Sequence, residues 1–143
     1  MGDQEENLEG LLYTSAAIVP FDADELSRLL ASCKARNRDA GITGLLLMSG
    51  RSFMQYIEGP ADALEETFNR ISSDLRHREV TVYFRRYIEE RLFPGWAMSL
   101  RTETDLPPDL VEACTPFFDK GFDDPPAAAE EAHKLLLRFA KMG

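Results

Sequence analysis

Cysteine is scarce in this chain: of its 143 residues only Cys33 and Cys114 are cysteines, and they form no CxxC pair. This scarcity argues against a disulfide framework and against a zinc site. No apolar run approaches the roughly 20 residues that a membrane-spanning helix requires. The opening MGDQEENLEG is acidic and polar, unlike a secretory signal. We therefore expect a reduced, cytoplasmic protein.

Basic residues are also in short supply. The chain has 16 lysines and arginines against 25 aspartates and glutamates, which leaves a net charge of −9. This balance argues against nucleic acid, and against an anionic membrane surface, as the main partner. The length is that of one ordinary domain, and a hydrophobic share of 44% is enough for a core without disulfides or metal.

Hydrophobic periodicity predicts a defined order of strands and helices. A capping box at Asp22 and Glu25 marks a helix that ends before Gly41, and Pro60 marks the start of a second helix that ends near residues 74–77. Strands are predicted at residues 11–15, 42–48, 52–58, 80–87 and 96–100. The order βαββαββ predicts an α+β, ferredoxin-like fold: a five-stranded sheet with two helices on one face.

Proline pairs at 107–108 and 125–126 separate the end of the chain from this unit. Helices are expected near residues 108–114 and 127–141, where they would cover the bare sheet face or contact a partner. The predicted organisation is a disordered lead-in at 1–9, a domain at 10–102 and a helical extension at 103–143.

Several polar side chains share a face with apolar ones. Asn37 lies about three turns after Leu26, on the apolar face of the first helix. Gln55 lies between Phe53 and Ile57 on one face of a strand. If the strand faces point at the helices, the side chains that can converge are Tyr13, Asn37, Gln55, Trp96 and Met98. This set holds no metal-ligand cluster and no nucleophile–base pair, but its amides suit a planar heterocycle with C=O and N–H groups.

The order and spacing of several short motifs narrow the possibilities further. The motifs are Tyr13-x-Ser15, Asn37-x-x-x-Gly41-Ile42-Thr43-Gly44-Leu45-Leu46 and Phe53-x-Gln55-x-x-Glu58-Gly59-Pro60. They are followed by Asp74-x-Arg76-His77, Arg91-x-Phe93 and Trp96-x-Met98. Over roughly residues 10–101 the series resembles the BLUF family, blue-light sensors that use FAD.

The resemblance implies a flavin held between the two helices, with Asn37 hydrogen-bonded to the polar edge of its ring. Gln55 would lie between Tyr13 and the flavin. Blue light would drive electron transfer from Tyr13, with a proton following through Gln55, and the rearranged Gln55 would strengthen a hydrogen bond to the flavin C4=O. The absorption would shift to the red and recover in the dark. Trp96 and Met98 would relay the change to the sheet and the tail.

The same resemblance implies the cofactor contacts. The expected cofactor-binding residues are Tyr13, Ser15, Leu29, Cys33, Asn37, Phe53, Gln55, Ile71, Arg76 and His77. The expected cofactor is FAD, with FMN or riboflavin left open. The chain departs from the family at Cys33, where serine is frequent, and Arg36 could serve the flavin phosphates. Trp96 and Met98 are equally consistent with plain core residues.

The chain resembles the short, stand-alone members of the family. We therefore expect a sensor that is not itself an enzyme and that signals, as a homodimer, to a separate partner protein. An alternative is a flavin-free ferredoxin-like regulatory or ligand-binding module. An acyl phosphatase would need an arginine in a loop after the first strand, and residues 14–19 contain no arginine and no glycine. A flavin oxidoreductase would need a substrate-activating group, and none is evident.

Overall fold

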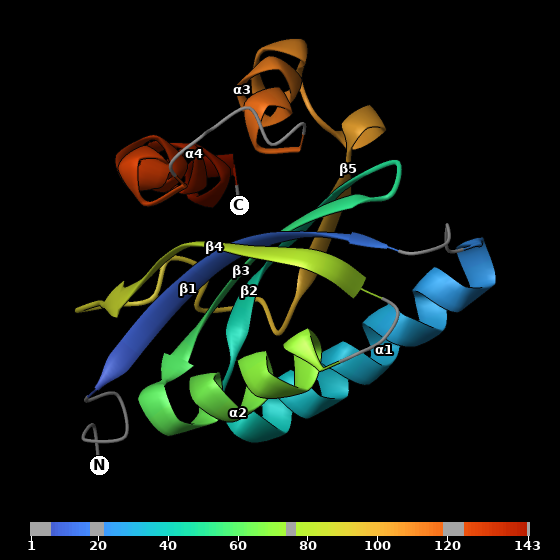
Figure 1. Cartoon of the computed structure of the whole chain (residues 1–143). Helices are drawn as coiled ribbons and strands as arrows, with labels where there is room; N and C mark the ends of the chain where they lie inside the picture. The colour runs from blue at the N-terminus through green and yellow to red at the C-terminus, as the bar shows by residue number, and fades with distance from the viewer. Residues whose placement is uncertain (1–6, 18–21, 74–76, 119–124, 143) are drawn as a thin grey trace.

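A five-stranded sheet lies between two pairs of helices in the computed structural model, which describes residues 7–17, 22–73, 77–118 and 125–142 (Figure 1). The elements are β1 (Leu8–Ala17), α1 (Ala23–Ala40), β2 (Thr43–Ser49), β3 (Ser52–Pro60), α2 (Ala61–Ser72), β4 (His77–Tyr87), β5 (Ser99–Thr102), η2 (Glu103–Asp105), α3 (Pro108–Phe118), η3 (Pro125–Ala128) and α4 (Ala129–Met142). Helices α1 and α2 lie on one face of the sheet, and α3 and α4 lie on the other.

The strand order is β4-β1-β3-β2-β5. β1 pairs antiparallel with both β3 and β4, β2 pairs antiparallel with β3, and β5 runs parallel to β2. The predicted ferredoxin-like arrangement is confirmed. Within the described residues, no helix combines the length and the apolar character needed to cross a membrane.

The ends of α1 are set by local chemistry. Asp22 accepts a hydrogen bond from the Glu25 backbone N–H at 2.7 Å, and the Glu25 carboxylate accepts one from the Asp22 N–H at 3.2 Å, which is the predicted capping box. At the other end Gly41 has a φ of +74°, a left-handed conformation that glycine adopts without steric cost. This stop places Asn37 in the last turn of the helix, close to the sheet.

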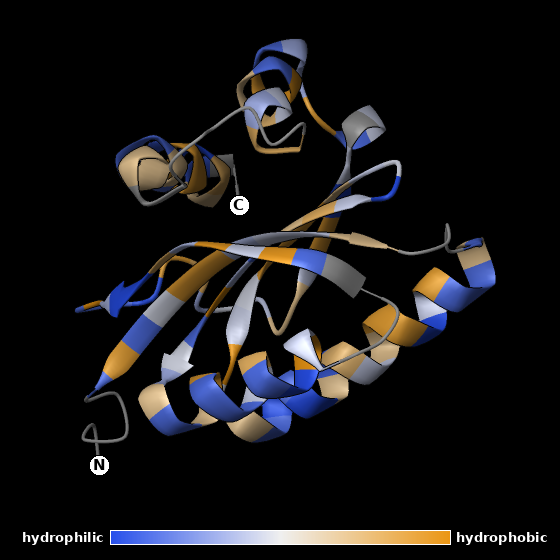
Figure 2. Ribbon diagram, in the orientation of Figure 1, coloured by the Kyte–Doolittle hydropathy of each residue, from blue (hydrophilic) through white to orange (hydrophobic). Residues whose placement is uncertain are grey.

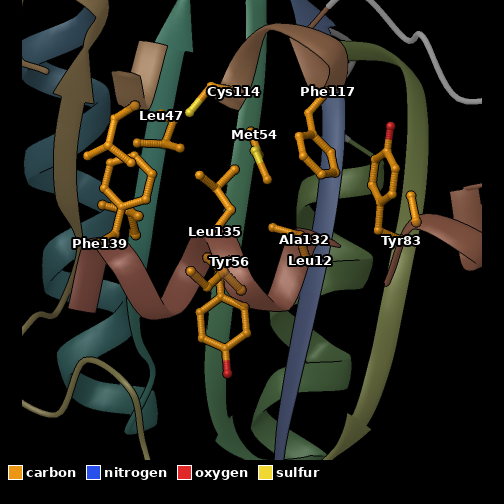
Figure 3. Packing of buried hydrophobic residues seen from close by; sticks show 14 of the residues in the cluster. Leu12, Leu47, Met54, Tyr56, Tyr83, Cys114, Phe117, Ala132, Leu135 and Phe139 are labelled. Carbon is orange, nitrogen blue, oxygen red and sulfur yellow. The ribbon is translucent and has the colours of Figure 1, made fainter. Parts of the chain in front are cut away.

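The sheet separates two cores, because successive side chains of a strand point to opposite faces. The helix-side core consists of Leu11, Tyr13, Ala17, Ile42, Leu46, Phe53, Ile57, Leu64 and Met98. The tail-side core consists of Leu12, Leu45, Leu47, Met54, Tyr56, Tyr83, Phe93, Leu110, Cys114, Phe117, Ala128, Ala132, Leu135, Leu136 and Phe139 (Figure 3). Hydrophobic residues run along the strands, while hydrophilic residues occupy much of α1 and α2 (Figure 2). The C-terminal extension therefore covers the face that α1 and α2 leave bare.

The last strand differs from its prediction. β5 begins at Ser99, so Trp96 and Met98 precede it instead of alternating within it. The reason is a turn in which the Trp96 N–H donates to the Phe93 carbonyl at 3.1 Å, which interrupts the extended backbone. As a result Met98 belongs to the helix-side core, whereas Trp96 packs against the tail-side core. The expectation that both residues share one face is wrong.

Two element ends differ slightly from their predicted positions. β1 begins at Leu8, inside the predicted lead-in of residues 1–9, of which 1–6 lie outside the described residues. α2 ends at Ser72, slightly before the predicted stop. Arg76 also lies outside the described residues.

Candidate functional site

A cleft opens between α1, α2 and the helix-side face of the sheet. The space inside it, including solvent at its open mouth, is about 780 Å³. Its walls are formed by Tyr13, Leu26, Leu29, Leu30, Cys33, Arg36, Asn37, Leu46, Phe53, Gln55, Thr67, Arg70 and Ile71. Most of these side chains are apolar, so the few polar ones determine how a bound molecule is oriented.

Tyr13, Gln55 and Met98 form a chain of contacts across the floor of the cleft. Tyr13 and Gln55 are direct partners in the β1–β3 register, so their side chains leave the same face of the sheet. The Tyr13 O–H donates a hydrogen bond to Gln55 Oε1. Gln55 Nε2 in turn donates to the Met98 Sδ atom at 3.5 Å. A thioether is a weak acceptor, so the amide is held firmly at its oxygen and loosely at its nitrogen.

The Tyr13 phenol is protected from water. It is 2% exposed, and its ring meets the Phe68 ring of α2 edge-on at 5.6 Å between centroids. Burial raises the pKa of Tyr13 well above its ordinary value, and the nearby Cys33 thiol adds to the rise. Tyr13 therefore keeps its proton at neutral pH and acts as a hydrogen-bond donor to Gln55.

Asn37 provides the second amide of the cleft. Its side chain is 5% exposed, and its Nδ2 donates to the Ala97 carbonyl at 2.7 Å. An asparagine amide has two N–H donors and a carbonyl oxygen, so this bond leaves donor and acceptor capacity for a bound molecule. The bond also connects α1 to the segment that carries Met98.

The residues present fit a flavin. A flavin has a flat ring with an apolar edge, a polar edge of C=O and N–H groups, and a phosphate-bearing chain. Leu29, Phe53 and Ile71 offer apolar walls, and Asn37 and Gln55 offer the amides that match the polar edge. Two guanidinium groups belong to the exposed part of the lining, those of Arg36 and Arg70. Arginine is well suited to phosphate recognition.

The structure brings together most of the predicted site residues. Those that line the cleft are Tyr13, Leu29, Cys33, Asn37, Phe53, Gln55 and Ile71. Met98 is not part of the lining but contacts the Gln55 side chain. Ser15 is buried in β1 and is not part of the lining. Trp96 lies on the other side of the sheet, where its ring centroid is 5.0 Å from that of Phe93. His77 opens β4, and its side chain lies outside the described part of the structure.

Sequence reasoning missed several residues of the lining. Thr67 lies on α2 four residues before Ile71 and three before Arg70, so helical spacing was the available signal. Leu46 is the β2 partner of Gln55 in the sheet. Its place could have been found only by aligning the β2–β3 hairpin residue by residue.

Comparison with known proteins supports a family assignment. The family model described as "BLUF: Sensors of blue-light using FAD" matches residues 8–99. The photoactivated adenylate cyclase subunit beta of Euglena gracilis is 36% identical over 100 residues, which are 69% of this chain and 12% of that protein. The chain thus spans about an eighth of the length of this relative.

Solved structures agree with the sequence comparison. The dark-state structure of BlrB, described as a BLUF protein, is 29% identical with a TM-score of 0.74 and covers 94% of this chain and 98% of its own. The structure of BlrP1 from Klebsiella pneumoniae with FMN and cyclic diGMP is 31% identical with a TM-score of 0.67. That match covers 89% of this chain and 35% of BlrP1. The similarity to BlrB extends beyond the sheet to nearly the whole chain.

Proposed function

Because the chain belongs to the BLUF family of flavin-binding blue-light sensors, we propose that light acts in it through Tyr13 and Gln55. When bound, the flavin supplies the absorption of blue light and, once excited, an acceptor for one electron. Asn37 and Gln55 would hold the polar edge of the ring, and Leu29, Phe53 and Ile71 would enclose its faces.

The observation that carries this proposal is the hydrogen bond from Tyr13 to Gln55 Oε1. A phenol that loses an electron becomes a strong acid, so its proton moves along the bond that it already makes. Tyr13 is 2% exposed, so Gln55 receives the proton in preference to water. The buried pair therefore combines an electron donor with a built-in proton acceptor.

Gln55 then rearranges. Its amide would accept the Tyr13 proton at Oε1 and give up one from Nε2 to the flavin, which has taken up the electron. Return of that electron and of a proton to Tyr13 would restore the phenol and leave Gln55 as the imidic tautomer. Its former bond to the Met98 sulfur is weak, so little opposes rotation of the side chain. The rotated side chain would present its O–H group, a stronger donor than an amide N–H, to the C4=O oxygen of the flavin. This stronger hydrogen bond would cause the expected red shift.

We further propose that the segment before β5 transmits this change. Ala97 bonds Asn37 and Met98 contacts Gln55, while Trp96, the preceding residue, packs against the tail-side core. Met98 would respond first, and Trp96 would pass the movement to α3 and α4. The extension at 103–143 would then act on a separate partner protein, with 10–102 as the sensing domain.

The remaining assignments follow from the family. We propose FAD as the cofactor, with Arg36, Arg76 and His77 near its phosphate-bearing chain, and Cys33 and Ser15 as further contacts. Because the matched family model describes sensors, we propose that the matched part of this chain senses light without catalysis of its own. A cytoplasmic homodimer is the form that we propose for it.

The proposal is tested by absorption spectroscopy of the purified protein, in the dark, after blue light and again in the dark. A flavin spectrum that shifts reversibly to the red, and that no longer does so in Gln55→Leu, would support it. A colourless protein that takes up no FAD would favour the flavin-free regulatory module instead.

A further inference from the structure

A buried carboxylate lies behind the cleft, on the tail side of the sheet. Among the residues that the structure describes, Glu58 is the one charged side chain that is completely buried, at 0% exposed. The Leu92 N–H donates to its Oε1 at 2.7 Å, and the Phe93 N–H and the Thr43 hydroxyl each donate to its Oε2 at 2.8 Å. Burial, and after it the nearby Glu58 carboxylate, raise the pKa of Tyr56 above its ordinary value. A buried charge is tolerated when donors satisfy it this fully.

Two of these donors belong to the β4–β5 loop, residues 88–98. The same loop supplies one acceptor for each of the cleft amides: the Ala97 carbonyl accepts from Asn37 at 2.7 Å, and the Met98 sulfur accepts from Gln55 at 3.5 Å. Glu58 is therefore bound to the middle of the loop, and the cleft amides are bound to its C-terminal end.

A short turn from Phe93 to Trp96 joins these two parts of the loop. The Trp96 N–H donates to the Phe93 carbonyl at 3.1 Å, and the Trp96 carbonyl accepts from the Gly44 N–H of β2 at 2.9 Å. Phe93 is 1% exposed and packs edge-on against Tyr56. A shift at Phe93 would thus reach Ala97 and the cleft through a single hydrogen-bonded turn.

We propose that Glu58 is a positioning residue of the light switch: by clamping the Leu92 and Phe93 amides it fixes where the Ala97 carbonyl and the Met98 sulfur meet Asn37 and Gln55. The proposal rests on the proposed function, because it concerns the same two amides. Glu58 does not touch the cleft and is not part of its lining.

The clamp requires a carboxylate. An ionised carboxylate only accepts hydrogen bonds, so both oxygens can face N–H and O–H donors. Glutamine in its place would turn an NH₂ group toward at least one of these donors and leave it unpaired, at a cost comparable to a lost buried hydrogen bond. Glu58→Gln keeps the shape of the side chain but replaces one of its two acceptor oxygens with an NH₂ group.

The experiment compares flavin-loaded wild type, Glu58→Gln, Thr43→Val and the control Glu66→Gln, which neutralises an exposed glutamate of α2. Two readouts are measured well below the unfolding temperature: deuterium exchange of peptides from residues 88–98, and the size and dark recovery of the red shift at equal flavin occupancy. In Glu58→Gln we expect faster exchange in the loop and a recovery rate altered by roughly 2- to 30-fold. Thr43→Val, which removes one donor to Glu58 and the acceptor of the Arg91 guanidinium, should change both readouts less and in the same direction.

The outcomes separate positioning from mere stabilisation. A looser loop with wild-type red shift and recovery, in either variant, would overturn the proposal, and so would wild-type exchange and recovery in Glu58→Gln. If Glu58→Gln does not fold, Thr43→Val decides alone by the same criteria. Absence of a reversible red shift in the wild type would instead defeat the proposed function, and the loop exchange would still report whether Glu58 is the clamp.

Discussion

Tyr13 and Gln55 lie opposite each other in the antiparallel strands β1 and β3, and the Tyr13 phenol donates a hydrogen bond to the Gln55 amide oxygen. The pair is therefore held by the register of the sheet as well as by its own bond. A slip of one residue in either strand would send one side chain to the opposite face. Because both residues are buried, the bond is shielded from exchange with water.

Met98→Leu tests the loosely held end of the Gln55 amide. Leucine nearly conserves the volume of the 3%-exposed Met98, so the fold should lose less than about 1.5 kcal/mol. Gln55 Nε2 would lose its dark-state acceptor, which destabilises the dark orientation. We expect dark recovery to slow by about two- to tenfold, the equivalent of one weak hydrogen bond. Time-resolved absorbance measures this, with Met48→Leu on β2 as the control. Equal recovery in the two variants would contradict the assignment.

Trp96→Phe tests the separation of Trp96 from the cleft. Trp96 packs on Phe93 and against the tail-side core, so the substitution should lower the free energy of unfolding by about 1 kcal/mol. The dark spectrum and the amplitude of the red shift should stay unchanged. Urea unfolding and difference spectroscopy on the same preparation measure both quantities. A changed dark spectrum with normal stability would mean that Trp96 reaches the flavin.

The positions of Met98 and Trp96 on opposite sides of the sheet show where sequence reasoning succeeds and where it stops. Tyr13, Asn37 and Gln55 were predicted to converge because they lie within regular elements, where a period of 2 or 3.6 determines the face. Trp96 and Met98 were assigned to one strand face because their spacing of two fits a strand. The turn from Phe93 to Trp96 breaks that period, and its hydrogen bonds depend on Gly44, which is distant in the sequence. The Glu58 clamp was missed for the same reason.

Cys33 gives a chemical footprint of the cleft. It is partly exposed and lines the cleft, whereas Cys114 is 1% exposed in the tail-side core, where burial raises its pKa to about 11. An alkylating reagent should label Cys33 in the flavin-free protein and leave Cys114 unlabelled. Added FAD should protect Cys33. Peptide mass spectrometry measures both sites in one sample, so Cys114 is an internal control. Labelling of Cys33 that saturating FAD leaves unchanged would place the ligand elsewhere.

The raised pKa of Tyr13 predicts how stability depends on pH. The folded state holds the phenolic proton more tightly than the unfolded chain, whose tyrosine pKa is about 10. The resulting stabilisation is fully present below pH 10 and is lost as the pH rises toward the folded-state pKa. Above pH 10 this group lowers the free energy of unfolding by about 1.4 kcal/mol per pH unit. Tyr13→Phe should make the decline shallower by that amount in urea titrations. Tyr87→Phe, at an exposed position, should not.

The most direct test is the light-minus-dark difference spectrum of flavin-loaded Tyr13→Phe beside wild type and Tyr87→Phe. Phenylalanine preserves the ring packed on Phe68 and removes only the hydroxyl that bonds Gln55. We predict normal flavin binding and a reversible red shift in wild type and Tyr87→Phe, and no reversible red shift in Tyr13→Phe. A full, reversible red shift in Tyr13→Phe would show that the switch does not begin at the Tyr13–Gln55 bond.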